Sequence, residues 1–470
     1  MKAVLAIDLG ATSGRAVLGF IKANKLIIRE IKRFSNTPIK VKGLLCWDVE
    51  VLFSHILDSI KTAKEAAEIV SVGIDTWGVD FALLDEQGKL LSLPVHYRDE
   101  RTRGILTQVA EFASLSDLYS KTGNQLMEIN TLFQLMKTKS ELPDKYFKAD
   151  QLLLMPDYFN YLLTGKAVVE KSIASTTQML NPLTQDWNQE VLSLFEITDV
   201  MLPNIVKEGH RLGKIKAKYQ LGSIEVINVC EHDTASAIAS IPKVKDPVLY
   251  ISSGTWSLIG TELKHPILTK EAFEGQFTNE IGHDSSVTFL KNCTGLWIVE
   301  ELRRAFQRQD QTFEFADITT MVEAVSTTVP IIDTESPEFS QPGDMIHKIQ
   351  AFCRQTQQNV PQTPGELFTC AYHSLASQYK LVIEQLESLT HETYEEIYFM
   401  GGGSKSAYFT QLVANMTNKP CITGLSEATA IGNIIVQLIA QGDLKDMVAA
   451  KALVQNSFEF QIYSPKKEGT

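Results

Sequence analysis

Residues 8–15 read Asp-Leu-Gly-Ala-Thr-Ser-Gly-Arg and lie between two apolar runs. Residues 2–8 form the first run, and residues 15–20 form the second. Two apolar runs joined by a few small residues are typical of a β-hairpin. The sequence therefore predicts a hairpin whose turn carries glycines and hydroxyl groups, with Asp8 at the end of the first strand.

A similar arrangement recurs in the second half of the chain. Residues 248–260 again run from an apolar segment through the small turn Ser-Ser-Gly-Thr at 252–255 into another apolar segment. Between the two hairpins, residues 49–68 carry apolar side chains at helical spacing, and residues 74–85 read as a strand, a turn and a strand. Strands that alternate with helices indicate an α/β fold. We expect two related α/β halves, residues 1–243 and 244–470, joined by a polar linker at residues 241–246.

Length and composition set further limits. A chain of 470 residues exceeds the size at which one core usually stops growing, which favours two domains. Its net charge of −12 disfavours nucleic acid as a partner. No apolar run approaches the roughly 20 residues that span a bilayer, and residues 1–8 lack a secretory pattern, so we expect a cytoplasmic protein with no membrane partner. The six cysteines form no Cys-x-x-Cys pair and are expected as free thiols, although Cys353 and Cys370 flank one segment and could pair if oxidised.

The two small-residue turns are candidate phosphate sites. Glycine lets the backbone approach a ligand closely, and the Thr12 and Ser13 hydroxyls could hold phosphate oxygens. Asp8 could hold Mg²⁺ through water. The chain has no Gly-x-x-x-x-Gly-Lys-Ser/Thr motif, so an ATP site here is not a P-loop. An ordinary tight turn explains either hairpin equally well when it is taken alone.

Residues 231–237, Glu-His-Asp-Thr-Ala-Ser-Ala, follow an apolar strand and read as the start of a tightly packed helix. Asp233 would lie at the helix N-terminus, where a carboxylate is stabilised. Such a carboxylate could act as a general base toward a sugar hydroxyl. The alternative is an aspartate that only caps the helix. His232 has no second histidine at ligand spacing, which favours packing or hydrogen bonding over metal binding.

Two more motifs carry possible chemistry. Trp77 and Gly78, with Asp80 nearby, could bind a sugar through an aromatic face and hydrogen bonds, unless Trp77 is a core residue. The glycine triplet at 401–403 follows a predicted strand at 397–400. It could leave a flat surface for adenine, or it could be a flexible turn.

In this order, the motifs resemble those of the FGGY carbohydrate kinases over nearly the whole chain. The segments that carry the resemblance most specifically are residues 73–85 and 250–260. The resemblance implies two ribonuclease-H-like (actin-like ATPase) domains with a catalytic cleft between them. It also implies ATP- and Mg²⁺-dependent phosphorylation of a small ketose sugar, with Asp233 as the proton acceptor. A rival of a different class is an actin-like or chaperone-like ATPase, which shares the phosphate hairpins but does not need the sugar residues.

The resemblance further assigns individual residues to the two ligands. The residues expected near ATP are Ala11, Thr12, Ser13, Gly14, Arg15, Thr255, Glu300 and Gly402. The residues expected near the sugar are Gly78, His232, Asp233, Thr234 and Asn292. Glu300 departs from the glutamine of relatives, and its carboxylate could still accept a hydrogen bond from a ribose hydroxyl.

Overall fold

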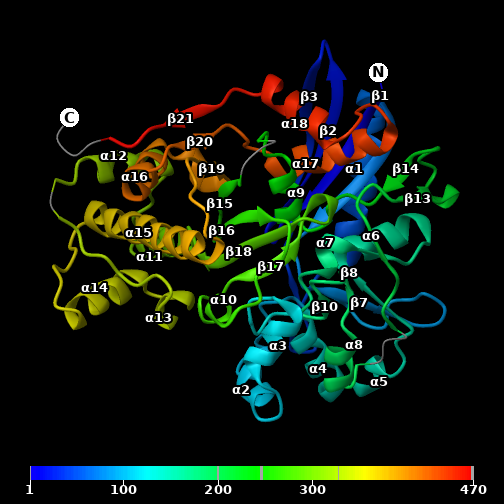
Figure 1. Ribbon diagram of the computed structural model, residues 1–470, viewed down its shortest axis with the longest axis horizontal. Coiled ribbons are helices and arrows are strands. Elements are labelled where there is room, and N and C mark those ends of the chain that lie inside the picture. Colours follow the sequence, from blue (N-terminus) through cyan, green and yellow to red (C-terminus); the bar gives the residue numbers. More distant parts are fainter. Residues whose placement is uncertain (1, 198–200, 244–246, 327, 467–470) are drawn as a thin grey trace. The chain divides into compact units, whose positions relative to one another are not determined.

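The structure is a computed structural model that describes residues 2–197, 201–243, 247–326 and 328–466 (Figure 1). The chain divides into two compact units. The first unit consists of Met1–Lys245, Glu262–Phe289 and Glu427–Phe458, and the second consists of Asp246–Thr261, Leu290–Ser426 and Glu459–Thr470. The linker predicted at 241–246 includes residues 244–246, which lie outside the described residues.

The compact units are discontinuous, unlike the contiguous halves 1–243 and 244–470 that the sequence suggests. Two segments from the second half of the chain belong to the first unit. One of them carries α17 (Ala428–Gln441), where Gln437 Nε2 donates to the carbonyl of Leu5 at 3.0 Å and Asn433 Nδ2 donates to the carbonyl of Gly73 at 3.1 Å. These bonds join α17 to strands more than 350 residues earlier in the sequence, so a local pattern does not reveal them.

The first unit is built on a six-stranded sheet with the order β13-β14-β6-β1-β2-β3. The strands are β1 (Lys2–Leu9), β2 (Ser13–Lys22), β3 (Lys25–Ser35), β6 (Glu68–Thr76), β13 (Arg211–Lys214) and β14 (Glu225–Ile227). β1 runs antiparallel to β2 and parallel to β6, which confirms the predicted first hairpin. Asp8 on β1 is in register with Asp75 on β6, so the two aspartates occupy neighbouring positions at the carboxyl ends of these strands.

Helices complete the first unit. α1 (Val49–Ala66) begins where the Asp48 side chain accepts a hydrogen bond from the amide of Val51, and its buried Ile56 and Ile60 belong to the same core cluster as Leu5 and Ile7 of β1. α9 begins at the predicted position and covers Asp233–Ala239. The other helices are α2 (Ile105–Ala110), α3 (Leu115–Thr122), α4 (Thr131–Glu141), α5 (Pro143–Tyr146), α6 (Met155–Thr164), α7 (Lys171–Ala174), α8 (Gln189–Leu194), α10 (Lys270–Glu274) and α18 (Met447–Ser457).

Short strands also occur in this unit. The paired ones are β4 (Ile39–Val41) with β5 (Leu44–Cys46), β7 (Phe81–Leu84) with β8 (Gln151–Leu154), β9 (Val169–Glu170) with β12 (Ile205–Val206), and β10 (Leu180–Asn181) with β11 (Asp186–Trp187). β17 (Thr278–Ile281) is held by two backbone amides: Ile281 N donates to Ser175 Oγ at 2.8 Å, and Asn279 N donates to the carbonyl of Gly123 at 2.8 Å. These bonds fix the backbone on both sides of Glu280.

In the second unit the strand order is β18-β16-β15-β19-β20-β21. The strands are β15 (Leu249–Ser253), β16 (Trp256–Leu263), β18 (Val287–Thr294), β19 (Ile397–Met400), β20 (Cys421–Thr423) and β21 (Gln461–Tyr463), and β16 and β18 have residues in both units. β15 pairs antiparallel with β16, as predicted for the second hairpin, and parallel with β19.

Helices of the second unit include the long α15 (Pro364–Thr390), whose N-terminus is a capping box of Thr363 and Glu366. The others are α11 (Trp297–Gln307), α12 (Phe315–Glu323), α13 (Pro337–Ser340), α14 (Met345–Gln355) and α16 (Ala407–Thr417). Within the described ranges of both units, no helix is long and apolar enough to cross a membrane.

Candidate active site

Three aspartates gather at the carboxyl edge of the first sheet. Asp8 ends β1, Asp75 lies near the end of β6, and Asp233 is the first residue of α9. The amide of Thr76 donates to the carbonyl of Glu231 at 2.9 Å, which brings the segment before α9 beside the end of β6. Burial raises the pKa of Asp8 to about 6, and the nearby negative charge of Asp233 adds to this rise. Burial and the charge of Asp8 raise the pKa of Asp75 well above its usual value.

The turn of the first hairpin is ordered by its own backbone. Gly10 N donates to the carbonyl of Ser13 at 2.9 Å, and Asn36 N donates to the carbonyl of Thr12 at 3.0 Å. Thr12 is exposed, whereas Ala11 and Ser13 are half-buried. The tip of the turn is therefore accessible to a ligand.

Gly14 is buried and Arg15 is half-buried on the second strand of the same hairpin. A side chain at Gly14 would meet the Phe34 ring at 2.3 Å, so this glycine is required for packing whatever the ligand. Arg15 Nε lies 2.9 Å from Asp8 Oδ2, and Arg15 Nη1 donates to Glu427 Oε2 at 2.6 Å. The guanidinium partly compensates the charge of Asp8.

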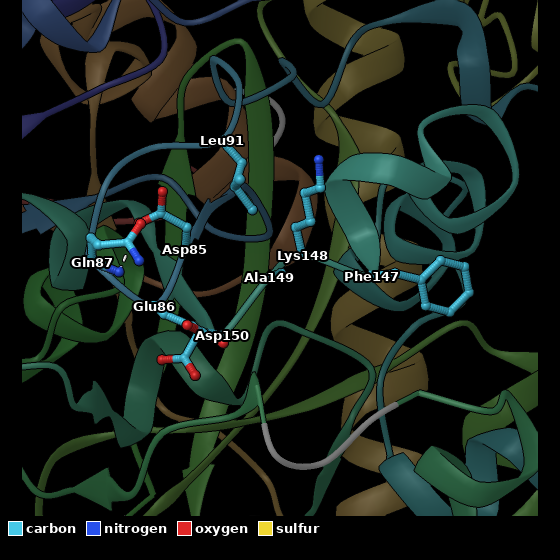
Figure 2. A pocket seen from close by; sticks show the side chains of 8 residues that line it. All are labelled: Asp85, Glu86, Gln87, Leu91, Phe147, Lys148, Ala149 and Asp150. Atoms are coloured by element: carbon cyan, nitrogen blue, oxygen red, sulfur yellow. Dashed lines mark hydrogen bonds between the residues drawn. The ribbon is translucent and has the colours of Figure 1, made fainter.

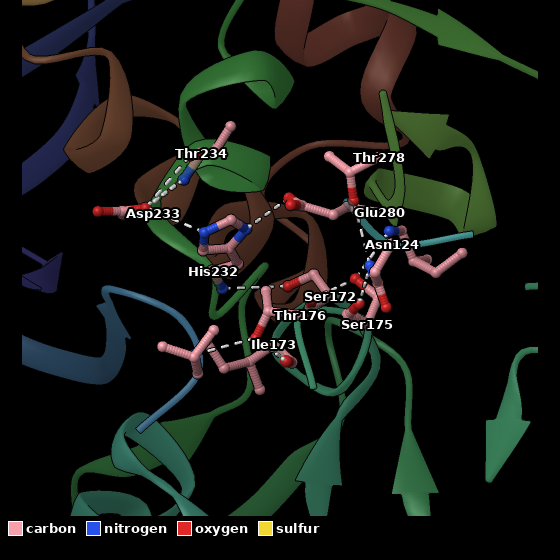
Figure 3. A network of polar contacts seen from close by, with 12 residues as sticks. Asn124, Ser172, Ile173, Ser175, Thr176, His232, Asp233, Thr234, Thr278 and Glu280 are labelled. Carbon is pink, nitrogen blue, oxygen red and sulfur yellow. Dashed lines mark hydrogen bonds and ion pairs between the residues drawn. The ribbon is translucent and has the colours of Figure 1, made fainter. Parts of the chain in front are cut away.

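Asp233 sits in a set of polar contacts at the start of α9 (Figure 3). Its Oδ1 accepts from the amide of Thr234 at 2.7 Å and lies 3.4 Å from His232 Nε2. About a third of its side chain is exposed, at 34%. Burial raises the pKa of Asp233, while the charge of His232 and the hydrogen bond from Thr234 oppose that rise. The carboxylate is thus accessible at one side and fixed at the other.

Buried carboxyl groups hold the segment that precedes Asp233. Glu231 Oε1 accepts from Asn160 Nδ2 and from Asn228 Nδ2, each at 2.6 Å. Glu170 Oε2 accepts from the amide of Glu231 at 3.1 Å, and Ser172 Oγ accepts from the amide of His232 at 3.1 Å. Sequence reasoning missed these residues, because Glu170 and Ser172 lie 60 or more positions from their partners.

The structure favours the core alternative for Trp77. Its side chain is buried, and its ring centroid lies 3.9 Å from that of Trp47. Asp80 accepts from Trp47 Nε1 at 2.6 Å, Trp77 Nε1 at 3.1 Å, Gln134 Nε2 at 2.8 Å and Tyr97 N at 3.1 Å. Four donors around one carboxylate fix the loop that carries Gly78, which is half-buried next to Thr176.

Four of the predicted residues belong to the second unit. Thr255 is exposed at the turn of the second hairpin, and Asn292 is half-buried on β18. Gly402 is exposed, and a side chain there would approach only the carbonyl of Ser253, at 3.8 Å, so packing does not require a glycine. Arg303 Nη1 donates to both carboxylate oxygens of Glu300 at 3.1 Å, and this ion pair would compete with a ribose hydroxyl.

A separate pocket of about 390 Å³ lies in the first unit (Figure 2). Its lining includes Asp85, Glu86 and Asp150, together with Lys148 and Phe147. None of the predicted site residues lines it. This acidic pocket is therefore distinct from the aspartate cluster at the sheet edge.

Comparison with known proteins places the chain among sugar kinases. The family model "FGGY family of carbohydrate kinases, N-terminal domain" matches residues 3–239, and the corresponding C-terminal domain matches residues 249–441. Proteins named rhamnulokinase from Oceanobacillus iheyensis and Bacillus subtilis are 41% and 39% identical. The former alignment covers 98% of both chains, and the latter covers 98% of this chain and 95% of the relative.

Solved structures show the same fold at low sequence identity. A gluconate kinase from Lactobacillus acidophilus superposes with a TM-score of 0.80 at 17% identity, and a glycerol kinase from Plasmodium falciparum with a TM-score of 0.79 at 15% identity. Each comparison covers 99% of this chain and 94% of the other. The predicted two-domain α/β fold of actin-like kinases is confirmed. With both domains matched and close relatives aligned end to end, the chain belongs to the FGGY family of carbohydrate kinases.

Proposed function

We propose that this kinase transfers the γ-phosphoryl group of ATP to the 1-hydroxyl of L-rhamnulose, giving L-rhamnulose 1-phosphate. The observation that carries the reaction type is the placement of Asp233, a partly exposed carboxylate at the start of α9 beside Asp8 and Asp75. The sugar is proposed from the relatives named rhamnulokinase, which align over the full chain.

Asp233 is the proposed general base. Its Oδ1 is held by Thr234 and His232, so the carboxylate can meet a sugar hydroxyl without a large loss of side-chain entropy. Phosphoryl transfer passes through a loose transition state in most analyses, so a base mainly orients the hydroxyl and accepts its proton late. Gly78, His232, Thr234 and Asn292 are the proposed contacts to the other sugar groups.

ATP is the phosphoryl donor expected of this family. The proposed nucleotide contacts are the residues of the first turn, Ala11, Thr12, Ser13, Gly14 and Arg15, and, from the second unit, Thr255, Glu300 and Gly402. The exposed tip of the first turn and the open space at Gly402 support contact with phosphate and base. Glu300 would have to leave or share its ion pair with Arg303 to bind a ribose hydroxyl.

Mg²⁺ is the proposed metal, with Asp8 as its main protein contact. Asp75 Oδ1 is buried without a hydrogen-bond partner among the described residues, and it adjoins Asp8 across the two strands. No group of three or more histidine, cysteine or acidic side chains in the described ranges forms a complete metal cage. A pair of carboxylates fits Mg²⁺, which keeps several waters and takes one or two carboxylates. The bound ion would neutralise charge on the phosphates.

A panel of ketoses in an ADP-release assay tests the substrate. L-rhamnulose is expected to give the highest kcat/KM among L-rhamnulose, L-fuculose, L-fructose and D-xylulose. A higher value for L-fuculose or D-xylulose would assign the chain to another ketose, which is the alternative. ADP release that does not depend on any added sugar would instead favour an actin-like or chaperone-like ATPase.

The cytoplasm stays the proposed location of the reaction. All six cysteines are free thiols and buried, as is usual for proteins of reducing compartments. Cys353 and Cys370 are among them, so no disulfide joins them in this structure.

A further inference from the structure

His232 lies between two carboxylates at the start of α9. Its Nδ1 is 3.1 Å from Glu280 Oε2, and its Nε2 is 3.4 Å from Asp233 Oδ1. Figure 3 shows the imidazole ring directed toward Glu280 on one side and toward Asp233 on the other. His232 Nδ1 and Glu280 Oε2 are both buried, and apart from this ion pair neither has a hydrogen-bond partner among the described residues. His232 is therefore the one partner of Glu280 Oε2 among the described residues.

This geometry determines which form of the imidazole is favoured. A neutral imidazole has one N–H and one lone pair, so it can donate to only one of the two carboxylates and turns its lone pair toward the other. An imidazolium donates from both nitrogens and satisfies both carboxylates. Two flanking negative charges favour the charged form, and they raise the pKa of His232 although burial opposes the rise.

Glu280 is held firmly enough to keep its carboxylate beside His232. Its side chain is only 11% exposed, and the amides on both sides of it bond to Gly123 and Ser175. The neighbouring Thr278 accepts from Asn124 Nδ2 at 3.2 Å, and Asn124 also donates to the carbonyl of Ser175 at 2.8 Å. β17 is thus fastened to the segment after α7, so the carboxylate of Glu280 has little freedom to leave the ring.

We propose that Glu280 is a positioning residue for phosphoryl transfer, which holds His232 as an imidazolium that donates a hydrogen bond to Asp233. The inference rests on the proposed role of Asp233 as the base. In the ground state His232 carries a proton on each nitrogen and Asp233 is deprotonated. The sugar hydroxyl then gives its proton to Asp233, while both protons of His232 stay in place. Without Glu280, His232 loses a proton and Asp233 loses its cationic neighbour.

The substitution Glu280→Gln removes the negative charge of this side chain and keeps its size. The amide oxygen of the introduced glutamine can still accept from His232 Nδ1, so the ring keeps its place while its charge is no longer favoured. The direct effect of Glu280 on Asp233 is the reverse, since removing a negative charge lowers the pKa of Asp233, but it is smaller than the effect of His232. The other charges that act on this pair, Glu170, Asp8 and Asp75, are unchanged by the substitution.

The first experiment measures the pH profile of kcat/KM for the full-length Glu280→Gln variant. The acid limb is expected to move upward by about one pH unit, at the lower end of the roughly 1–3 units that a neighbouring opposite charge produces. At a fixed pH below the acid limb, activity is expected to fall about tenfold, which is what a shift of one pH unit in a single ionisation produces, and the loss is expected to shrink toward the plateau. An unchanged acid limb in a folded variant would overturn the proposal.

A matched control is available in the same unit. Glu208 Oε1 lies 3.5 Å from His283 Nε2, so Glu208→Gln also removes a carboxylate from a histidine partner, and Glu208 is not among the main charges that shift the pKa of His232 or of Asp233. Its acid limb is expected to coincide with that of the unmodified protein. An equal shift in Glu208→Gln would show a general charge effect and would contradict a specific role for Glu280.

A second measurement does not depend on how the variant folds. Nitrogen-15 NMR of histidine-labelled wild-type protein gives the pKa of His232, with its signal assigned from its loss in His232→Gln. The value is expected above the ordinary value of about 6.5. A value at or below about 6.5 would overturn the proposal while leaving Asp233 as the base. Activity retained in Asp233→Asn would instead remove the base assignment, whatever the pKa of His232.

Discussion

At the scale of single residues, Asp233 is the proposed general base, and the substitution Asp233→Asn tests that role. The asparagine keeps the size of the side chain but cannot accept the proton, so turnover is expected to fall by roughly 10²–10⁴-fold. ATP binding, measured by calorimetry, is expected to be retained. Asp144→Asn is the control, since Asp144 is an exposed acid in the first turn of α5. If the folded Asp233 variant kept more than about a tenth of normal turnover, the base would be another residue.

Asp8 is the residue at which a role in magnesium binding can be separated from a structural one. Asp8→Asn is expected to raise the Mg²⁺ concentration for half-maximal rate by roughly 10–100-fold, the usual cost of removing a group that binds the ion through water. The measurement is a magnesium titration at saturating ATP and sugar. Asp58→Asn, which breaks an exposed ion pair with Lys32, should leave the titration unchanged. If the Asp8→Asn titration matched that of the Asp58→Asn control, Asp8 would have a structural role and no role in magnesium binding.

At the scale of elements, α9 carries the proposed base and packs against α17, and the contact between these two helices depends on one glycine. A side chain at Gly432 on α17 would meet the carbonyl oxygen of Ser236 on α9 at 1.8 Å. Gly432→Ala therefore forces the helices apart. We expect it to destabilise the protein by about 1–3 kcal/mol, the usual cost of overpacking, although alanine is the better helix former.

A thermal melt and an activity assay measure the effect of Gly432→Ala together. Activity is expected to fall with stability, because the displaced end of α9 carries Asp233. Thr429→Ala, on a half-buried position of the same helix, serves as control and should change the free energy of unfolding by at most about 0.5 kcal/mol. Unchanged melting of Gly432→Ala would mean that α17 and α9 can separate without loss.

At the scale of the whole molecule, we predict that the first compact unit folds only when all three of its segments are present. A fragment of residues 1–243 lacks α17, so the carbonyl of Leu5 and the side chain of Ser71 lose their partner Gln437. It also lacks β17 and the segment around it. Circular dichroism is expected to show no cooperative thermal transition for this fragment. A chain of residues 1–466 keeps all three segments and should melt as the full chain does; a cooperative melt of 1–243 would contradict this view of the unit.

Local sequence patterns were sufficient to predict the helices and strands that surround the site. Both hairpins, α1 and the start of α9 at Asp233 lie where apolar periodicity and small-residue turns predict them. Long-range contacts were beyond such patterns. Asn433 donates to Asp75 Oδ2 at 2.6 Å across 358 positions, and nothing near either residue in the sequence indicates it. Glu280 was missed for the same reason, since only the folded chain brings β17 to His232.

Because α17 lies far from β1 and β6 in the sequence, the ribosome synthesises it long after these strands. A ribosome adds roughly 5–20 residues each second, so roughly 10–40 s pass between the synthesis of residue 243 and that of residue 458. During that interval β1 and β6 exist without the helix that satisfies Leu5, Gly73 and Asp75. Part of the sheet of the first unit therefore stays uncovered until α17, close to the end of this unit in the sequence, has been synthesised. Translation speed over the second half of the message thus sets how long this unfinished sheet is open to chaperones or to aggregation.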